Sequence, residues 1–263
     1  MKKRTLVIAD IHGALKALEQ ALKRANYTIN DNLIFLGDYV DGWSESSELI
    51  EYLINLKEVS NGNIIFILGN HDKWCKDWLN TGQTPIIWTQ QGGKATVESY
   101  IRTGHLVKDS HKEFFNKCLP YYIDEQNRGF VHGGFTSKKG LGHEPYDANY
   151  YWDRDLWNLA LMTHGRFHEG APESARRFEK HKEIFIGHTS TFNWKCKPHY
   201  PEFEDDNQTI KNGDIYVPMN RCNVWNLDTG AGYKGKVTIM DVDTKEYWQS
   251  DYVPELYPNE KGR

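Results

Sequence analysis

Histidine, aspartate and asparagine side chains recur in five short glycine-containing motifs along this 263-residue chain. The motifs are Asp10-Ile11-His12-Gly13, Gly37-Asp38-Tyr39-Val40-Asp41-Gly42, Gly69-Asn70-His71-Asp72, Val131-His132-Gly133-Gly134 and Gly187-His188-Thr189. Carboxylates, imidazoles and an amide oxygen are the ligands expected of borderline divalent metals such as manganese, iron or zinc. The glycines allow the backbone to turn sharply beside such ions. The five motifs in one chain therefore indicate metal-dependent chemistry.

The first three motifs follow apolar runs that predict buried strands. These runs, at residues 5–9, 33–36 and 64–68, are separated by segments 14–25 and 47–56, in which leucine and isoleucine repeat at helical spacing. Strand and helix in alternation are typical of parallel βαβ units. Ligands bind at the carboxyl ends of the strands in such sheets, so we expect the three loops to meet at one place.

The rest of the chain predicts further strands with less regular segments between them. Strands are expected at residues 129–132, 183–186 and 224–227, a hairpin at 236–241 and 245–248, and helices at 89–101, 112–118 and 148–162. The charged stretch 164–182 is expected to be a mobile surface segment, and 195–221 an excursion loop. No internal repeat or low-complexity tract is found in the sequence.

The composition argues against several classes of protein. The formal net charge is -4, whereas a protein that binds DNA or RNA through phosphate neutralisation is usually basic. The four cysteines form no C-x-x-C pair, so neither a zinc knuckle nor a dithiol motif is indicated. The apolar run after the basic first residues stops at Asp10, too early for a signal peptide, and no run approaches the length of a bilayer span. We therefore expect a cytoplasmic protein without membrane or nucleic-acid partners.

The five motifs together resemble the calcineurin-like metallophosphoesterase superfamily. Within it they are similar to the serine/threonine phosphatase branch, particularly bacterial and phage phosphatases and symmetrical diadenosine tetraphosphate hydrolases. The resemblance extends from about Lys3 to Trp248. It implies one domain over residues 1–263, of the α/β class, folded as a four-layer α/β/β/α sandwich with two mixed sheets. It also implies phosphoester hydrolysis by two metal ions.

The resemblance implies six ligands for two divalent ions, with manganese expected and iron or zinc as alternatives. They are Asp10 and His12 for the first metal, Asp38 as the bridge between both, and Asn70, His132 and His188 for the second. Two neighbouring cations need a shared anion to offset their repulsion, and they lower the pKa of a water between them. The resulting hydroxide would attack phosphorus in line.

Two further roles follow from the resemblance. His71 matches the general acid that protonates the leaving alkoxide, and Asp41 matches the carboxylate that holds this imidazole and keeps it protonated. Arg154, within Tyr151-Trp152-Asp153-Arg154-Asp155, resembles the Trp-x-Arg segment in which the arginine binds the substrate phosphate. A guanidinium offers phosphate a bidentate contact.

One position departs from the branch. The usual motif reads Gly-Asp-x-Val-Asp-Arg-Gly, but here Gly42 holds the arginine position and Trp43 follows it. A phosphate-binding cation is therefore missing, which leaves Arg154 as the main candidate. Three arginines of the charged middle segment are alternative replacements: Arg166, Arg176 and Arg177.

Several activities remain open at this point. The expected substrate is a phosphorylated molecule: a phosphoprotein, a nucleotide or a small phosphoester. A phosphomonoesterase is the first hypothesis, and a dinucleoside polyphosphate hydrolase or a phosphodiesterase is the alternative. A catalytically inactive binding module is disfavoured because such proteins usually lose metal ligands, and all six positions are occupied here.

Overall fold

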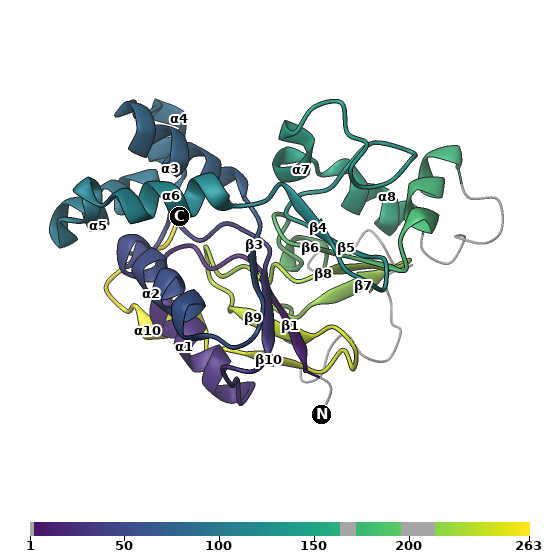
Figure 1. Ribbon diagram of the computed structural model, residues 1–263, viewed down its shortest axis with the longest axis horizontal. Coiled ribbons are helices and arrows are strands. Elements are labelled where there is room, and N and C mark those ends of the chain that lie inside the picture. The colour runs from purple at the N-terminus through teal and green to yellow at the C-terminus, as the bar shows by residue number, and fades with distance from the viewer. Residues whose placement is uncertain (1–2, 164–171, 196–213) are drawn as a thin grey trace.

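Two five-stranded sheets form the centre of the computed structural model, which describes residues 3–163, 172–195 and 214–263 (Figure 1). The first sheet has the strand order β10-β9-β1-β2-β3. Its strands are β1 (Thr5–Ile8), β2 (Asn32–Phe35), β3 (Ile64–Phe66), β9 (Thr238–Asp241) and β10 (Tyr247–Gln249). β1, β2 and β3 run parallel, as the alternation of strand and helix predicts, and β9 and β10 form the predicted antiparallel hairpin.

The second sheet has the order β4-β5-β6-β8-β7. Its strands are β4 (Tyr121–Ile123), β5 (Arg128–Val131), β6 (Glu183–Ile186), β7 (Met219–Arg221) and β8 (Val224–Asn226). The three central strands are parallel and the two edge strands antiparallel. Both sheets are therefore mixed, as expected.

The two sheets pack face to face through alternate residues of their strands. Leu6 of β1 faces the helices outside the first sheet, whereas Val7 and Ile34 face the second sheet. There they meet Phe130 and Phe185, whose rings stack with centroids 5.0 Å apart. This inner core fixes the distance between the sheets and hence between the loops at their ends.

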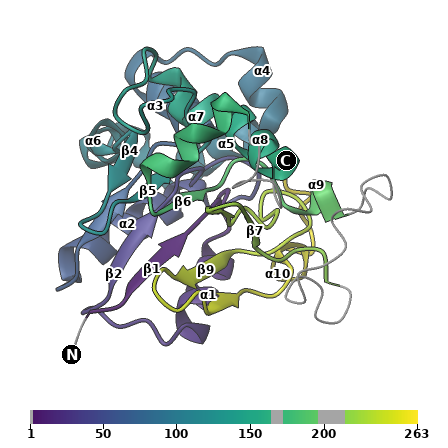
Figure 2. The same cartoon turned by 90° about the vertical axis from the view of Figure 1, so that its right-hand side faces the viewer.

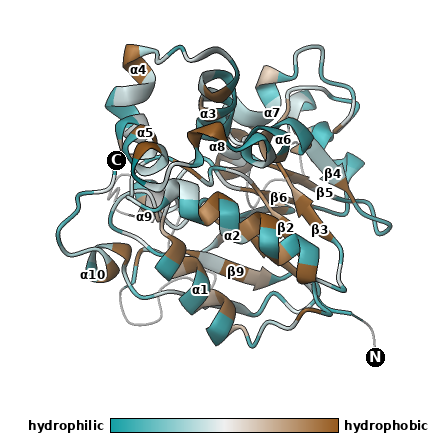
Figure 3. Ribbon diagram, turned by 60° about the vertical axis from the view of Figure 1, so that its left-hand side comes forward, coloured by the Kyte–Doolittle hydropathy of each residue, from teal (hydrophilic) through white to brown (hydrophobic). Residues whose placement is uncertain are grey.

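Helices cover the outer face of each sheet. The first sheet is covered by α1 (Leu15–Arg24), α2 (Ser46–Val59), α3 (Asn70–Thr81), α5 (Lys94–Thr103) and α6 (Asp109–Lys117). The second is covered by α7 (Ala148–Trp152), α8 (Asp155–Thr163) and the 3₁₀ helix η3 (Glu173–Lys180). Figure 2 shows the helices on either side of the sheets, and in Figure 3 the strands are mostly hydrophobic while the helices mix hydrophobic and hydrophilic residues. The predicted α/β/β/α sandwich is confirmed.

Some elements differ from the sequence-based expectation. β4, β7 and the short helix α10 (Val253–Leu256) were not predicted, because segments of three or four residues carry too little periodicity. The helix expected at residues 89–101 is interrupted: Gly92 has a φ of +101°, so a π-helical turn, η1 (Thr89–Gly93), precedes α5. This turn lies against the loop of the second motif, where Gly42 donates its N–H to the Gly92 carbonyl oxygen at 3.2 Å.

The two segments expected to be irregular are partly regular. Residues 164–171 and 196–213 lie outside the described residues, and so do Arg166 and Cys196. Within the expected mobile segment, however, η3 buries Arg177 and Phe178, so the prediction of a mobile surface is wrong there. The expected excursion loop ends in β7, which pairs with β8. None of the helices in the described ranges combines the length and apolar composition needed to cross a membrane.

Candidate metal centre

Loops from both sheets bring the six predicted ligand residues together. All six are buried: Asp10, His12, Asp38, Asn70, His132 and His188. They form two triads, Asp10/His12/Asp38 and Asp38/His132/His188, and within each triad the ligand atoms lie within 4.8 Å of one another. The prediction that the strand-end loops meet at one place is confirmed, and the two triads share one carboxylate.

The shared carboxylate lies between the two groups. Asp38 Oδ2 is 3.6 Å from His12 Nε2, which is itself 3.7 Å from Asp10 Oδ2. Asp38 Oδ1 is 3.3 Å from His132 Nε2. The Asn70 amide oxygen joins the second group, 3.1 Å from the same nitrogen of His132. The two oxygens of Asp38 thus face different triads, which is the arrangement a bridging ligand requires.

Backbone carbonyls fix which nitrogen each imidazole presents to the centre. His12 Nδ1 lies 3.1 Å from the Val40 carbonyl oxygen, and His132 Nδ1 lies 2.9 Å from that of Leu36. A carbonyl only accepts, so Nδ1 carries the proton in each ring. When the ring is neutral, the lone pair of Nε2 is directed into the centre, as in metal sites where a second partner orients the ligand.

The donor set fits divalent cations. Among the buried polar atoms of the described residues, Asp38 Oδ2 and His188 Nε2 have no hydrogen-bond partner. Burying such atoms without a partner costs about 1–3 kcal/mol each, a cost that coordination of a cation would remove. Both atoms belong to the triads, so each triad contains a buried ligand atom that a cation could satisfy.

The electrostatic field of the centre is strong. Burial opposes a charge on His132, but the Asp38 carboxylate outweighs it and raises the pKa of His132 to about 9. Burial and the positive charges of His132, Arg154 and Arg263 hold the pKa of His188 well below its usual value. Burial, together with the charge of Asp10, raises the pKa of the neighbouring Asp228 to about 6. A cation entering here would displace the proton of His132, so its binding should release protons.

Four residues of the centre adopt left-handed backbone conformations. The φ angles are +56° at His12, +53° at Asp38, +74° at Asp41 and +67° at His188. For residues other than glycine this region costs about 1–2 kcal/mol. Such strain persists only where the surroundings over-determine the conformation, and it concentrates at functional sites.

Asp72 supplies part of that constraint. Its carboxylate accepts hydrogen bonds from the backbone N–H groups of Asp38 at 2.7 Å, Tyr39 at 2.8 Å and Gly69 at 2.9 Å. It therefore ties the loop after β2 to the first turn of α3. Asp72 had no predicted role. Its place at the end of the Gly69-Asn70-His71-Asp72 motif was the one feature of the sequence that could have pointed to it.

The glycines of the motifs are required by close approach. A Cβ atom on Gly69 would lie 2.2 Å from Asp38 Oδ1, and one on Gly187 would lie 2.2 Å from Asp10 Oδ1. Neither distance can be accommodated, so a side chain at either position would push a carboxylate out of the centre. The glycines were expected to allow sharp turns, and they also leave room for the carboxylates of the centre.

His71 and Asp41 form a buried pair beside the centre. His71 Nδ1 is 2.7 Å from Asp41 Oδ2, and the two rings of His71 and His12 are 5.1 Å apart. Asp41 also accepts hydrogen bonds from Trp88 Nε1 at 2.7 Å and Thr96 Oγ1 at 2.6 Å. Trp88 and Thr96 were not predicted to position Asp41. Only Thr96 lies in a recognisable sequence segment, Gly92-Gly93-Lys94-Ala95-Thr96. The pairing leaves Nε2 of His71 to face a substrate.

Arg154 lies at the rim rather than within the triads. Its Nη1 donates to Thr189 Oγ1 at 3.0 Å and to the His188 carbonyl oxygen at 3.3 Å. The preceding Trp152 packs edge-on against Trp74, with ring centroids 5.0 Å apart, and Trp74 packs against His71 at 5.3 Å. Two tryptophans thus extend along the rim from the side of Arg154 to the side of His71.

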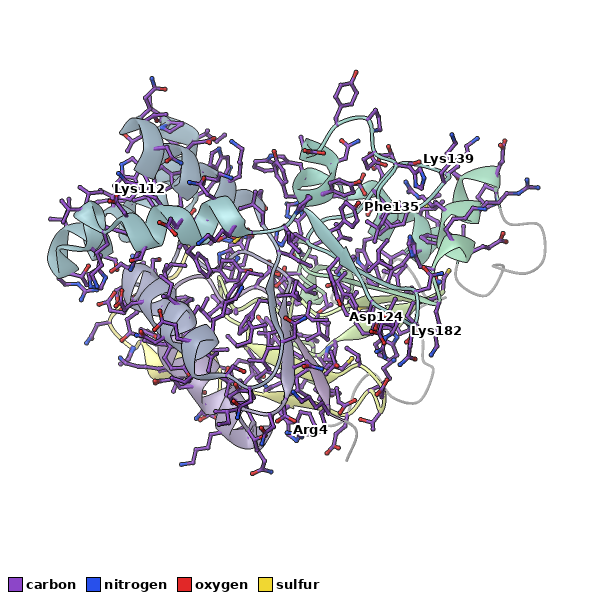
Figure 4. All side chains as sticks on the ribbon, in the orientation of Figure 1. Arg4, Lys112, Asp124, Phe135, Lys139 and Lys182 are labelled. Atoms are coloured by element: carbon purple, nitrogen blue, oxygen red, sulfur yellow. The ribbon has the colours of Figure 1, made fainter. Side chains whose placement is uncertain are left out.

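The alternative arginines of the middle segment differ in position. Arg177 is buried and donates to the Phe135 carbonyl oxygen at 2.7 Å, so its guanidinium is engaged in the half of the molecule that holds the second sheet (Figure 4). Arg176 is exposed on η3. A residue that sequence reasoning missed, Arg263, contacts Nε2 of His71 through Nη1. No motif or apolar pattern points to it.

Comparisons with known proteins show a family and a fold. The family model for calcineurin-like phosphoesterases matches residues 3–192. A symmetrical bis(5'-nucleosyl)-tetraphosphatase of Pseudomonas fluorescens (strain SBW25) is 23% identical, and the alignment covers 92% of each chain. The catalytic subunit of serine/threonine-protein phosphatase 6 of Drosophila melanogaster is 36% identical over 66 residues, 25% of this chain and 22% of its own. The crystal structure of a putative diadenosine tetraphosphatase has a similar fold, with a TM-score of 0.54, 13% identity and coverage of 94% of this chain and 92% of its own.

Proposed function

This chain belongs to the calcineurin-like phosphoesterase family and is a metal-dependent phosphoester hydrolase, and we propose that it acts on phosphate monoesters in the manner of serine/threonine phosphatases. The observation that carries the proposal is the pair of buried triads that share Asp38. Two triads with a common carboxylate offer places for two cations side by side, and one phosphate group can bridge them.

The proposed metal ligands are the six buried residues of the centre. They are Asp10 and His12 on one side, Asp38 between, and Asn70, His132 and His188 on the other. When bound, a pair of divalent ions supplies Lewis acidity and acidifies water at neutral pH. Manganese is the first choice because the set combines carboxylate, amide and imidazole donors, and iron or zinc are alternatives.

His71 is the proposed general acid, positioned by Asp41. The hydrogen bond of 2.7 Å between His71 Nδ1 and Asp41 Oδ2 sets the plane of the ring. Nε2 then supplies the proton that the departing alkoxide oxygen needs. Proton donation of this kind typically contributes about 10²- to 10⁴-fold to the rate.

Arg154 is the proposed phosphate-binding residue at the rim. It lies beside His188, one of the proposed ligands, and its guanidinium is exposed enough to turn toward a phosphate that bridges the two metals. A charge-assisted, bidentate contact would hold that group and favour the charge that develops on it.

A dinucleoside polyphosphate hydrolase is the second candidate. It is favoured by the Trp74–Trp152 pair, whose rings lie 5.0 Å apart at the rim, because a base that stacks on an aromatic side chain gains about 1–3 kcal/mol. The Pseudomonas fluorescens relative is named as such an enzyme, and its alignment with this chain covers 92% of its length.

Four substrates distinguish the candidates. We expect the manganese-loaded protein to hydrolyse p-nitrophenyl phosphate and a phosphoserine peptide with higher kcat/KM than bis-p-nitrophenyl phosphate or diadenosine tetraphosphate. A preference for diadenosine tetraphosphate would instead establish the second candidate. Turnover of the diester alone would contradict both, and metal content measured on the same samples would show whether a low rate reflects an unloaded centre.

A further inference from the structure

The gap left by glycine at position 42 is filled from elsewhere in the chain. Gly42 has a φ of +108°, and a Cβ atom there would lie 3.5 Å from the backbone nitrogen of Arg263 and 3.6 Å from its Cβ. We propose that Arg263 supplies the phosphate-binding cation that Gly42 lacks. The inference rests on the proposed function, since it assigns a further residue to the same site.

The guanidinium of Arg263 lies at the edge of the metal centre. Its Nη1 contacts Nε2 of His71, the nitrogen that faces a substrate. Gly232 lies between Arg263 and His12: a Cβ atom on Gly232 would be 3.0 Å from Arg263 Nε and 2.6 Å from His12 Cδ2. A Cβ atom on Gly92, just before α5, would lie 3.0 Å from Arg263 Cβ, and in Figure 3 the mark C, at residue 263, lies beside α5, the helix that carries Thr96.

This guanidinium has no anionic side chain to neutralise it. Within the described ranges no carboxylate forms an ion pair with Arg263, and its Nε is buried without a hydrogen-bond partner. Its other neighbour is the Tyr233 ring, whose centroid is 4.7 Å from Cζ. An arginine offers five N–H donors, and burying its charge without a counter-ion is costly. A phosphate at the metal centre would provide both the negative charge and the missing acceptors.

Trp43, which replaces the glycine of the usual motif, and the following Ser44 contact the segment 260–263. Trp43 is fully buried, and a Cβ atom on Gly262 would lie 2.9 Å from Trp43 Cζ2. Ser44 donates to the Glu260 carboxylate from its backbone N–H at 2.9 Å and its hydroxyl at 2.7 Å. Gly42 thus leaves room for Arg263, while Trp43 and Ser44 contact the residues just before it.

The backbone of Arg263 is fixed at the same place. Its N–H donates to the Gly232 carbonyl oxygen at 2.9 Å, and Trp43 Nε1 donates to the neighbouring Ala231 carbonyl oxygen at 2.7 Å. The ring of Tyr257 packs on Trp43 with centroids 5.3 Å apart. A fixed backbone limits the conformational entropy that the side chain loses when it binds an anion.

Arg263 and Arg154 lie on different sides of the centre. Arg263 contacts His71, whereas Arg154 contacts the backbone of His188. A phosphate bound between them would receive one guanidinium from each side. Arg263 would turn from Nε2 of His71 to the phosphate oxygens, leaving that nitrogen beside the oxygen of the leaving group.

The test compares Arg263→Ala with Arg263→Lys and a matched control, Lys261→Ala, which removes the same charge from an exposed residue of the same segment. The full chain, loaded with manganese, is titrated with inorganic phosphate by calorimetry and assayed with p-nitrophenyl phosphate. We expect Arg263→Ala to weaken phosphate binding about 10- to 100-fold and to lower kcat/KM by a similar factor. Arg263→Lys should recover part of the loss, Lys261→Ala should stay within about twofold, and metal content should not change.

Two results would overturn the proposal. Wild-type phosphate affinity in Arg263→Ala would show that the guanidinium does not bind the anion. A rise in activity would show that the segment obstructs the site instead. The calorimetric comparison does not depend on turnover. If the wild-type protein hydrolyses no monoester, the proposed function fails, while the phosphate affinities still decide the role of Arg263.

Discussion

Two groups of histidine and acidic side chains in this molecule have the residue types of a metal site. One is the strand-end group, formed by the two triads around Asp38. The other is the helical group, Glu51, His105 and His111, whose ligand atoms also lie within 4.8 Å of one another. In composition and spacing the two groups are alike.

The groups differ in how their polar atoms are used. His111 Nδ1 is 3.0 Å from the Tyr100 hydroxyl and its Nε2 is 2.9 Å from Glu51 Oε2. Lys108 Nζ donates to the same carboxylate oxygen at 2.9 Å. Burial lowers the pKa of His111, so the neutral ring donates from Nε2 to Glu51 and accepts from Tyr100. A cation here would have to displace a lysine, and among the described residues His105 Nδ1 is the one buried atom of the group without a partner.

The comparison shows that residue types alone do not identify a metal site. The strand-end group has buried atoms on Asp38 and His188 that no described protein atom satisfies, whereas in the helical group both nitrogens of His111 and one oxygen of Glu51 have protein partners and only His105 Nδ1 is buried without one. Variants of either group, or of the residues beside the centre, should therefore differ in whether they change metal content, catalysis or only stability.

The largest effect is expected from Asp38→Asn. The amide is neutral, so it cannot offset the repulsion between two cations, and metal content and turnover should be lost together. Elemental analysis of the purified variant, alongside its rate with p-nitrophenyl phosphate, checks this. Wild-type turnover in Asp38→Asn would contradict the two-metal interpretation of the strand-end group.

His71→Asn should separate catalysis from metal binding. We expect both metals to remain while the rate with an alkyl phosphate falls about 10²- to 10⁴-fold, since the alkoxide then leaves without a proton. The deficit should shrink for p-nitrophenyl phosphate, whose phenolate needs no acid. Equal deficits for the two esters would show that His71 is not the acid.

Arg154→Ala should leave the metals in place and lower kcat/KM about 10- to 100-fold, the usual range for a charge-assisted hydrogen bond. Arg154→Lys should restore part of the loss, because lysine keeps the charge but not the fork. Steady-state kinetics with p-nitrophenyl phosphate measure kcat/KM for both variants. Unchanged efficiency in Arg154→Ala would leave Arg263 as the principal phosphate-binding arginine.

The smallest effect is expected from Glu51→Gln in the helical group. Hydrogen bonds from His111 and Lys108 lower the pKa of Glu51 to about 2 from an ordinary value of 4.5. The stabilisation is therefore present above about pH 4.5 and is lost as the pH falls toward 2. Because the carboxylate is one-third exposed, the variant should lose no more than about 1 kcal/mol at pH 7, measured by urea unfolding, and less at pH 3.5. A drop in metal content would refute the distinction between the groups.

The sequence predicted those site residues that lie in short motifs near the ends of strands. The strand pattern predicted that the loops carrying Asp10, Asp38 and Asn70 meet at one place, because each lies within a few residues of the end of a buried strand, and the family resemblance implied their roles as ligands. The alternation of strands and helices predicted parallel βαβ units, and the family resemblance implied the sandwich. Arg263 was missed because its contact with His71 spans 192 positions, and no periodicity records such a contact.

Residues that only orient other residues were harder to predict for the same reason. Trp88 reaches Asp41 from 47 positions away, and it lies directly before a π-helical turn in a segment that was expected to be regular helix. Asp72 acts on the backbone of another loop rather than through its own motif. Their residue types match many ordinary core and capping positions, so the tertiary structure was needed to assign them.

The ligands of the candidate centre come from both sheets, and this has a mechanical consequence. Asp10 and Asp38 follow strands of the first sheet, whereas His132 and His188 follow strands of the second. The sheets also pack through apolar contacts such as those of Phe130 and Phe185, and two ion pairs, Arg128–Asp243 and Lys245–Glu183, join them. A pair of ions held by these side chains would act as a clasp across the sandwich, joining chain segments that lie between 94 and 178 positions apart. Sliding of one sheet over the other would then have to stretch coordination bonds, so loading the centre would stiffen the whole molecule.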